Sequence, residues 1–399
     1  MKITFVSNYL NHHQIPICEK LIELTNNDFT FVAMEPMEEE RKKMGWGIDK
    51  LAYEIRFLES QEEREKATKL FEESDVVIYG GGSYARYFNS RIKQKKLTFL
   101  YSERVYKNGL YRVISPRGQY YMRKYNTRYK KDNLFLLCAS AYAPLDYGLV
   151  GAYKNKSFKW GYFPKTMVYD TKELFDLKQN KKVEILWVSR FIPWKHPEKV
   201  VKLAKKLTSD GYNFHVTMIG IGPEKQKTIQ SVVALGLNDK FAFIDSMSPL
   251  EVRKYMEKSN IFLLTSDYGE GWGAVINEAM NSGCAVVASH AIGATPYLIK
   301  DGENGLVYKD NNFNDFYRCV KSLIDDRNLA NSLGLKAYED IITTWNAENA
   351  ATKLYEFCEN FLLGKQNPRP SFGPMSKAKN ICQYKMFKMI KGKRVWCQR

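Results

Sequence analysis

The sequence predicts an α/β protein with two doubly wound domains, each built around a parallel sheet. Short apolar runs, which are typical of buried strands, alternate with amphipathic helical segments along most of the chain. A chain of 399 residues with 44% hydrophobic residues is too long for one typical domain and can form two hydrophobic cores. A polar, Lys-rich stretch near residues 163–181 separates two series of such segments and indicates a linker.

The first series opens with the apolar run of MKITFVSN, which predicts a strand, and continues with a helix at Ile15–Leu24. Four further strands are expected in this half of the chain: Phe29–Val32, Asp75–Tyr79, Leu97–Tyr101 and Leu134–Ala139. Because helical segments separate these strands, the sheet is expected to be parallel. We therefore expect an N-terminal domain at residues 1–165.

The second series contains the strand-like runs Val183–Val188 and Ile261–Thr265 and predicts a C-terminal domain at residues 166–345. An amphipathic segment follows at residues 346–363, with Leu354 and Phe357 on its apolar side, and predicts a helix. The last residues, 364–399, are rich in Pro, Lys and Ser and predict a basic, flexible tail.

The net charge of +17 is concentrated in two segments. Between Arg86 and Lys131 there are fourteen basic residues and one acid, and the tail has ten basic residues and no acid. A helix through residues 117–131 would carry four cations on one side, beside a stripe of tyrosines: Arg117, Lys124, Arg128 and Lys131. Such a face suits an anionic membrane surface; the alternatives are a solvated face whose tyrosines pack on the core, or a nucleic-acid surface.

Cysteine usage and hydropathy predict the compartment. The seven cysteines have neither paired nor metal-ligand spacing, and the first residues do not resemble a signal peptide. The longest apolar stretch, near residues 134–143, is far shorter than the roughly 20 residues of a membrane-spanning helix. We expect a cytoplasmic protein, with the basic segments placing it peripherally at the inner membrane face.

The most informative segment is SDYGEGWGAVINEAMNSGCAVVASHAIGATPYLIKDGENGLV, residues 266–307. It follows a predicted strand, turns at closely spaced glycines and then enters a short helix. Glu270 lies before this helix and Glu278 lies inside it. Because parallel sheets bind ligands at the carboxyl ends of their strands, both carboxylates are expected to face a ligand there. Glu270 taken alone could instead only be a favourable partner for the helix dipole.

A second polar group follows the run Val183–Val188, in the segment ILWVSRFIPWKHPEKVV. Arg190 and Lys195 both come after the carboxyl end of that strand. Cations in this position can stabilise the negative charge that develops when a phosphate leaves a sugar. Each of them taken alone would more commonly be a solvated loop charge.

Together with VTMIGIGPE, these segments resemble the donor-binding signature of retaining glycosyltransferases of family 4, which have the GT-B fold. The matching residues run from about Ile185 to Leu306, and the first half of the chain matches only in outline. The resemblance implies two Rossmann-like domains that face a central cleft, with the helix at residues 346–363 crossing back to the first domain.

The resemblance also implies roles for individual residues. Glu270 would contact the donor sugar, Glu278 would hold the ribose hydroxyls, and the diphosphate would be bound by Arg190 and Lys195. Glu270, Arg190 and Lys195 are the predicted catalytic residues. The other predicted donor-binding residues, besides Glu278, are Trp272, Gly273, Ala274, Gly220 and Gly222.

The N-terminal half departs from the family pattern, because its first loop lacks the glycine pair and no histidine follows the middle strand. Acceptor contacts are therefore expected at residues that follow the predicted strands: His12, His13, Gly81, Gly82, Ser102, Glu103 and Arg104. The structural alternatives are that a histidine only caps the first helix, that the glycines only form a turn, and that Glu103 only pairs with Arg104.

The predicted activity is transfer of a hexosyl-type sugar from a nucleoside diphosphate sugar to a saccharide acceptor, either free or lipid-linked, in cell-surface polysaccharide synthesis. Retention of configuration is expected from the resemblance. Neither a metal nor a cofactor is expected, because no Asp-x-Asp occurs and the two cations would do the work of a metal. The alternatives are a nucleotide-sugar epimerase on the same fold and a non-enzymatic nucleic-acid-binding protein, although nucleic acid is not the expected partner. A dinucleotide-dependent oxidoreductase is disfavoured because VSNYLNHH lacks the G-x-G-x-x-G turn.

Overall fold

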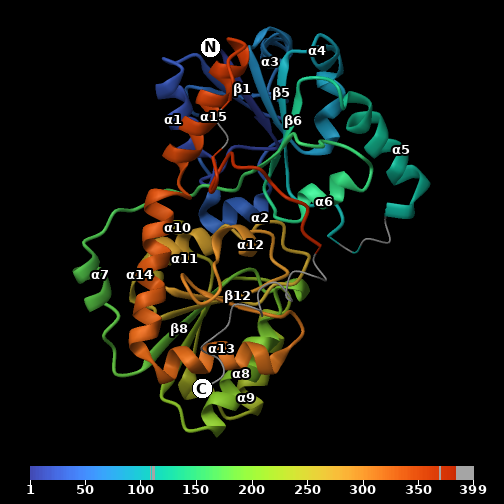
Figure 1. Ribbon diagram of the computed structural model, residues 1–399. Helices are drawn as coiled ribbons and strands as arrows, with labels where there is room; N and C mark the ends of the chain where they lie inside the picture. The colour runs from blue at the N-terminus through green and yellow to red at the C-terminus, as the bar shows by residue number, and fades with distance from the viewer. Residues whose placement is uncertain (108, 110–112, 368–369, 383–399) are drawn as a thin grey trace. The chain divides into compact units, whose positions relative to one another are not determined.

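The computed structural model describes residues 1–107, 109, 113–367 and 370–382. The described chain forms two compact units (Figure 1). The first unit comprises Met1–Lys165 and Thr344–Cys382, and the second comprises Thr166–Thr343. Each unit contains its own parallel sheet with helices around it.

The first unit is built on a seven-stranded parallel sheet with the order β3-β2-β1-β4-β5-β6-β7. Its strands are β1 (Ile3–Ser7), β2 (Phe29–Ala33), β3 (Glu54–Arg56), β4 (Val76–Gly80), β5 (Leu97–Ser102), β6 (Leu134–Cys138) and β7 (Ser157–Lys159). All five strands expected from apolar runs are present. The short strands β3 and β7 were not predicted, because each has three residues and ends in a basic side chain.

The helices of the first unit are α1 (Ile15–Leu24), α2 (Glu39–Arg41), α3 (Gln61–Glu73), α4 (Asn89–Lys93), α5 (Pro116–Tyr125), α6 (Ala143–Gly148) and α15 (Ala347–Leu362). Shorter helical turns occur at η1 (Lys42–Trp46), η2 (Gly82–Phe88) and η4 (Thr127–Tyr129). Helix α15 packs against α1 and buries Ala350, Ala351 and Leu354 (Figure 1). The last long helix of the chain therefore belongs to the unit formed by the first residues.

The helix expected through residues 117–131 is shorter than predicted, because α5 ends at Tyr125. The next residue, Asn126, is buried and leaves the helical conformation, and its side chain accepts a hydrogen bond from the Tyr153 hydroxyl at 2.8 Å. Tyr129 is buried as well and donates to Asn89 at 2.6 Å. Tertiary hydrogen bonds thus end the helix where its sequence alone would continue it.

Part of the tail that was expected to be flexible lies along β7. Backbone hydrogen bonds join Met375 and Ser376 to Lys159, and Ala378 to Ser157, at 2.8 to 3.0 Å. Met375 and Ala378 are buried, and Phe158 forms an antiparallel bridge with Lys377. This segment covers the exposed edge of the sheet, which explains why a Pro- and Lys-rich sequence takes a defined path here.

The second unit is built on a six-stranded parallel sheet with the order β10-β9-β8-β11-β12-β13. Its strands are β8 (Val183–Val188), β9 (Phe214–Ile219), β10 (Phe241–Ile244), β11 (Ile261–Leu264), β12 (Ala285–Ser289) and β13 (Leu306–Tyr308). The helices are α7 (Thr171–Asp176), α8 (Pro197–Ser209), α9 (Lys225–Ala234), α10 (Pro249–Lys258), α11 (Val275–Asn281), α12 (Thr295–Leu298), α13 (Phe313–Asp325) and α14 (Arg327–Thr343), with short turns η5 (Pro193–Lys195) and η6 (Asn238–Lys240).

Two groups of helices surround this sheet (Figure 1). Helix α8 packs beside α9 and α13, and α11 packs beside α10 and α14. The central strands β11 and β12 are buried along their whole length, which accounts for their almost wholly apolar sequences. The fold class predicted from the sequence, two parallel-sheet α/β units, is confirmed.

Strand order reverses between β8 and β11 in the second unit. From β8 the chain continues outward to β9 and β10, and it then returns to β11 and proceeds to β12 and β13 on the other side. The loops that leave β8 and β11 therefore diverge at the same edge of the sheet. Ligands of open α/β sheets bind at such a switch point, outside the carboxyl ends of the strands.

Candidate active site

The switch point of the second unit is formed by the loop after β8, residues 189–196, and the loop after β11, residues 265–274. Hydrogen bonds hold the two loops together. The amide of Asp267 donates to the Trp194 carbonyl at 3.0 Å, and the Thr265 hydroxyl donates to the Lys195 carbonyl at 2.6 Å. Thr265 in turn accepts a hydrogen bond from the indole of Trp187, a fully buried residue of β8, at 2.9 Å. The core thus fixes the backbone that carries Lys195.

Lys195 and Glu270, both predicted from the sequence to be catalytic, meet at this switch point. The Lys195 ammonium forms an ion pair with the Oε2 atom of Glu270, although 75 residues separate them. The hydroxyl of Ser266 donates to the same carboxylate oxygen at 3.1 Å. The side chains of Lys195 and Glu270 are only 12% and 14% exposed, so this pair is screened less by solvent than a surface pair.

Glu278 lies in the first turn of α11 and is partly buried. Burial raises its pKa to about 7, against the opposing effect of the Arg253 guanidinium. Its carboxylate makes no hydrogen bond or ion pair within the described part of the chain. A partly buried carboxylate of this kind can accept hydrogen bonds from hydroxyl donors, which would offset its desolvation.

The two predicted glycines, Gly220 and Gly222, lie in the turn after β9. This turn packs against the loop after β8, which carries Arg190. A Cβ atom on Gly220 would lie 2.0 Å from the Ser189 carbonyl oxygen and 3.7 Å from the backbone nitrogen of Arg190. A Cβ atom on Gly222 would lie 2.4 Å from the Phe191 carbonyl oxygen. Both glycines also have positive φ angles, +147° and +144°. Their absent side chains let this turn lie against the loop that carries Arg190.

The predicted donor residues Trp272, Gly273 and Ala274 precede α11 directly. Trp272 is fully buried, its indole donates to Asn277 at 3.0 Å, and its carbonyl accepts from the Ala294 amide at 3.1 Å. Gly273 has a φ of +90°, and a Cβ there would lie 3.1 Å from Ile292 and 3.2 Å from Leu264. These contacts fix the backbone between Glu270 and Glu278.

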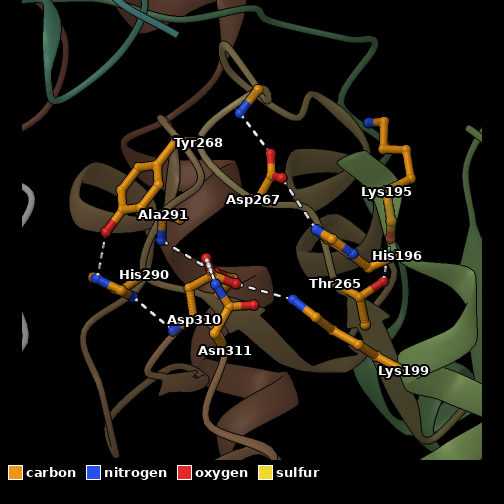
Figure 2. Close-up of polar contacts among 12 residues, drawn as sticks. Lys195, His196, Lys199, Thr265, Asp267, Tyr268, His290, Ala291, Asp310 and Asn311 are labelled. Carbon is orange, nitrogen blue, oxygen red and sulfur yellow. Dashed lines mark hydrogen bonds and ion pairs between the residues drawn. The ribbon is translucent and has the colours of Figure 1, made fainter. Parts of the chain in front are cut away.

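His196 was not predicted to have a role, yet it links the same two loops (Figure 2). Its Nε2 atom lies 3.1 Å from Asp267 Oδ2, and its Nδ1 atom lies 2.8 Å from Glu198 Oε1. Because each ring nitrogen faces a carboxylate, both nitrogens act as donors and the ring is an imidazolium. Asp267 is held in turn by the Gly269 amide at 2.7 Å. We call His196, Glu198 and Asp267 the loop latch.

The loop latch should make stability depend on pH. Hydrogen bonds from His196 to Asp267 and then to Glu198 raise the pKa of His196 from 6.5 to about 9. Since the folded-state pKa is the higher one, the stabilisation is fully present below about pH 6.5 and is lost as pH rises through 9. His196→Asn should therefore destabilise by about 1–2 kcal/mol at pH 6 and by little at pH 10.

Chemical denaturation of both proteins between pH 6 and pH 10 measures this difference. Asparagine is a suitable replacement because it tolerates the left-handed backbone of His196, whose φ is 51°. A difference in unfolding free energy that stays constant across the whole pH range would contradict the charged latch.

A second polar network continues from the ends of β11, β12 and β13 (Figure 2). The Lys199 ammonium lies 2.9 Å from Asp310, and the Asp310 amide donates to His290 Nδ1 at 3.0 Å. Because Nδ1 accepts, the proton of the neutral ring is on Nε2, which lies 3.0 Å from the Tyr268 hydroxyl. Sequence reasoning missed Tyr268, His290 and Asp310. The available signal was that each follows the carboxyl end of a parallel strand.

The first unit gathers some of the predicted acceptor residues at its own switch point, between β1 and β4. The rings of His12 and His13 lie 3.8 Å apart, and both lie edge-on to Trp46, at 4.6 Å and 5.3 Å. Burial, with a smaller effect from Arg41, lowers the pKa of His12 to about 4. Neither histidine caps α1, because the N-cap residue is Gln14.

The ends of β4 and β5 hold the other predicted acceptor residues. Gly81, with a φ of +87°, and Gly82 form the turn that leads from β4 into η2. Ser102 accepts from the Tyr147 hydroxyl at 2.9 Å, and Glu103 accepts from the Tyr162 hydroxyl at 3.0 Å.

Glu103 pairs with Lys107 rather than with Arg104. Arg104 is buried instead beside Asp146, with Nη2 and Oδ1 3.5 Å apart. Asp146 also accepts the backbone amides of Val105 and Tyr106, so Arg104 has a structural partner in the core of this unit.

Comparisons with known proteins relate this arrangement to a family. Residues 170–340 match the family described as glycosyl transferases group 1. Over 186 residues the chain is 25% identical to an uncharacterised glycosyltransferase of Methanocaldococcus jannaschii. The aligned region covers 46% of this chain and 47% of that relative. Over 168 residues it is 27% identical to the poly(ribitol-phosphate) alpha-N-acetylglucosaminyltransferase of Staphylococcus aureus, covering 42% of this chain and 33% of that protein. The chain thus spans less than half the length of either relative.

Solved structures resemble a larger part of the chain. HepE of Anabaena in complex with UDP superposes with a TM-score of 0.67 at 14% identity, covering 90% of this chain and 100% of HepE. Sucrose-phosphate synthase from Thermosynechococcus elongatus superposes with a TM-score of 0.64 at 14% identity, covering 92% of this chain and 100% of the synthase. Residues 170–340 therefore resemble the glycosyl transferases group 1 family, in a chain whose two Rossmann-like α/β units have the fold of GT-B proteins.

Proposed function

We propose that the protein transfers a hexosyl-type sugar from a nucleoside diphosphate sugar to a saccharide acceptor. The observation that carries this proposal is the contact of Lys195 with Glu270 at the switch point of a domain that matches the glycosyl transferases group 1 family. An ammonium group suits a diphosphate, and a carboxylate suits the hydroxyl groups of a sugar. The buried carboxylate of Glu278 suits the ribose hydroxyls of the nucleotide.

The reaction breaks the bond between the anomeric carbon and the β-phosphate oxygen, and its electron pair stays on the leaving diphosphate. Lys195 and Arg190 stabilise that developing charge. The acceptor hydroxyl forms the new bond, and its proton passes to an oxygen of the leaving phosphate. Attack from the face that the phosphate leaves would retain the anomeric configuration, which the sequence resemblance supports.

Uridine diphosphate sugars are the first donors to test, because the structure of HepE, a fold neighbour, was solved with UDP. The acceptor proposed is a saccharide, either free or lipid-linked, in cell-surface polysaccharide synthesis. The proposed polysaccharide context is supported by the name of a Rhizobium meliloti relative, lipopolysaccharide core biosynthesis glycosyltransferase LpsE. We also propose that the transfer needs neither a metal nor a cofactor, so that EDTA should leave the rate unchanged.

Product analysis with one radiolabelled nucleotide sugar tests this function. The expected result is label transferred to a saccharide, together with one equivalent of nucleoside diphosphate. Label that stays on the nucleotide in an epimerised sugar would instead indicate an epimerase. Salt-dependent RNA binding without turnover of any nucleotide sugar would also contradict the proposal.

We further propose that the protein works at an anionic membrane surface at the inner membrane face, through the exposed side of α5. Tyr120 and Tyr121 are 59% and 45% exposed on this helix, the cations Arg117 and Lys124 are exposed as well, and Ile114, which precedes the helix, is 82% exposed. The Arg117 guanidinium lies 6.0 Å from the Tyr121 ring, and the Lys124 ammonium lies 5.7 Å from the Tyr120 ring. Exposed aromatic and basic groups together suit the headgroup region of anionic lipids.

Two further predicted cations, Arg128 and Lys131, are exposed beyond the end of α5. The last part of the basic tail, residues 383–399, lies outside the described residues. No helix in the described part of the chain combines the length and the hydropathy that crossing a bilayer requires.

Co-sedimentation at low salt tests the membrane proposal. The protein should pellet with vesicles that contain phosphatidylglycerol and less with neutral phosphatidylcholine vesicles. The double variant Arg117→Gln, Lys124→Gln should lose part of this binding, since each cation near the surface contributes about 1 kcal/mol. Equal partition of the unmodified protein onto both kinds of vesicle would contradict the proposal.

A further inference from the structure

The ion pair between Lys195 and Glu270 joins the loop after β8 to the loop after β11 at the switch point. Lys195 ends η5, whose backbone is fixed to Thr265 and Asp267. Glu270 is held by its own amide, which donates to the Asp267 carbonyl at 3.1 Å, and by the Ser266 hydroxyl. The backbone segments that carry Lys195 and Glu270 are thus both fixed by hydrogen bonds. The fold itself therefore places the two charged groups in contact.

The neighbouring carboxylates are directed elsewhere. Asp267, in the loop after β11, and Glu198, in the first turn of α8, both face His196 in the loop latch. Glu270 is the carboxylate of these loops that contacts Lys195. A phosphate group that approaches Lys195 must therefore share or replace this one carboxylate, and it meets the negative charge of Glu270 when it does so.

The cost of that exchange differs between the two nucleotide forms. An intact nucleotide sugar can offer sugar hydroxyls to Glu270 in place of the ammonium that it loses. A nucleoside diphosphate has no sugar, so Glu270 would lose the Lys195 ammonium and gain no hydroxyl donor in its place. Losing the contact of a largely buried ion pair without a replacement is more costly than exchanging one of its partners for another.

We propose that the Lys195–Glu270 pair discriminates against the nucleoside diphosphate product and favours the intact nucleotide sugar. The pair re-forms when the sugar has left, and it then helps to displace the diphosphate. This inference rests on the proposed function, and it goes beyond it by assigning to Glu270 control over product release.

The test measures the affinity of UDP and of UDP-glucose by isothermal titration calorimetry. Glu270→Gln keeps the size of the side chain and removes its charge. The variant should bind UDP about 3- to 10-fold more tightly than the unmodified protein, while its affinity for UDP-glucose stays equal or falls. The ratio of the two dissociation constants therefore shifts toward UDP.

A matched control removes one negative charge from the same edge of the sheet without touching Lys195. Asp245 follows β10, is exposed and pairs with Lys225. Asp245→Asn should change the affinity for UDP by less than about twofold, because exposed charges are screened. Equal tightening by both variants would overturn the inference, since a general change of charge would explain it.

The remaining outcomes separate the inference from the function on which it rests. If the unmodified protein binds both nucleotides and Glu270→Gln binds UDP equally or more weakly, the discrimination is wrong and the transferase proposal stands. If the unmodified protein binds no nucleoside diphosphate or nucleotide sugar, both are overturned. Unchanged near-ultraviolet circular dichroism of the variant establishes that its fold is intact.

Discussion

Replacing Lys195 with alanine should lower kcat/KM for sugar transfer by about 100- to 1,000-fold. One preorganised donor to a developing negative charge contributes this much in other enzymes. Lys195 is anchored by the core through Thr265 and Trp187, so a neighbouring side chain cannot simply move into its place. Steady-state kinetics with a nucleotide sugar and its acceptor measure the effect.

An exposed lysine of the same unit provides the control. Lys205 lies on the exposed side of α8, and Lys205→Ala should leave kcat/KM within about twofold. The Lys195→Ala variant should stay folded, because Glu270 retains the hydrogen bond from Ser266. A loss of less than fivefold in kcat/KM for Lys195→Ala would remove Lys195 from the site.

Replacing Gly220 with alanine should destabilise the second unit by about 3–5 kcal/mol or prevent its folding. The added Cβ atom would lie 2.0 Å from the Ser189 carbonyl oxygen, which is backbone and cannot rotate away. The φ angle of +147° adds a conformational cost for any residue with a side chain. Urea denaturation, followed by circular dichroism, measures the free energy of unfolding.

A substitution at Gly236 distinguishes the steric cost of an added Cβ atom from the conformational cost of a positive φ. It also has a positive φ, +64°, but a Cβ atom there would meet nothing within 4 Å. Gly236→Ala should therefore cost only the conformational term, about 1 kcal/mol. Similar small losses of stability in both variants would show that the turn at Gly220 can move away from the loop that carries Arg190.

Apolar periodicity was sufficient to predict the fold, because strands such as β8 and β11 are buried along most of their length. It failed where tertiary contacts decide local structure. The segment at residues 372–378 has no apolar pattern, yet it pairs with the edge of β7. Helix α5 ends early because Asn126 is bound by Tyr153, a contact that no local pattern encodes.

The candidate site was partly predictable for a physical reason. Arg190, Lys195 and Glu270 follow parallel strands, and the carboxyl ends of such strands meet at one edge. The contacts of His196 with Asp267, and of Tyr268 with His290, join residues that are 71 and 22 positions apart. The spacing of residues in the sequence does not predict such pairs, so these contacts could be identified only in the folded structure.

Thermal denaturation with a panel of nucleotide sugars tests whether the switch point of the second unit is the donor site. At 100 times its dissociation constant, the correct donor should stabilise the unmodified protein by roughly 2.7 kcal/mol. Lys195→Ala and Glu278→Ala should show none of this stabilisation at the same concentration. Equal stabilisation of both variants and the unmodified protein, or no stabilisation of the unmodified protein by any nucleotide sugar, would contradict the assignment of this site.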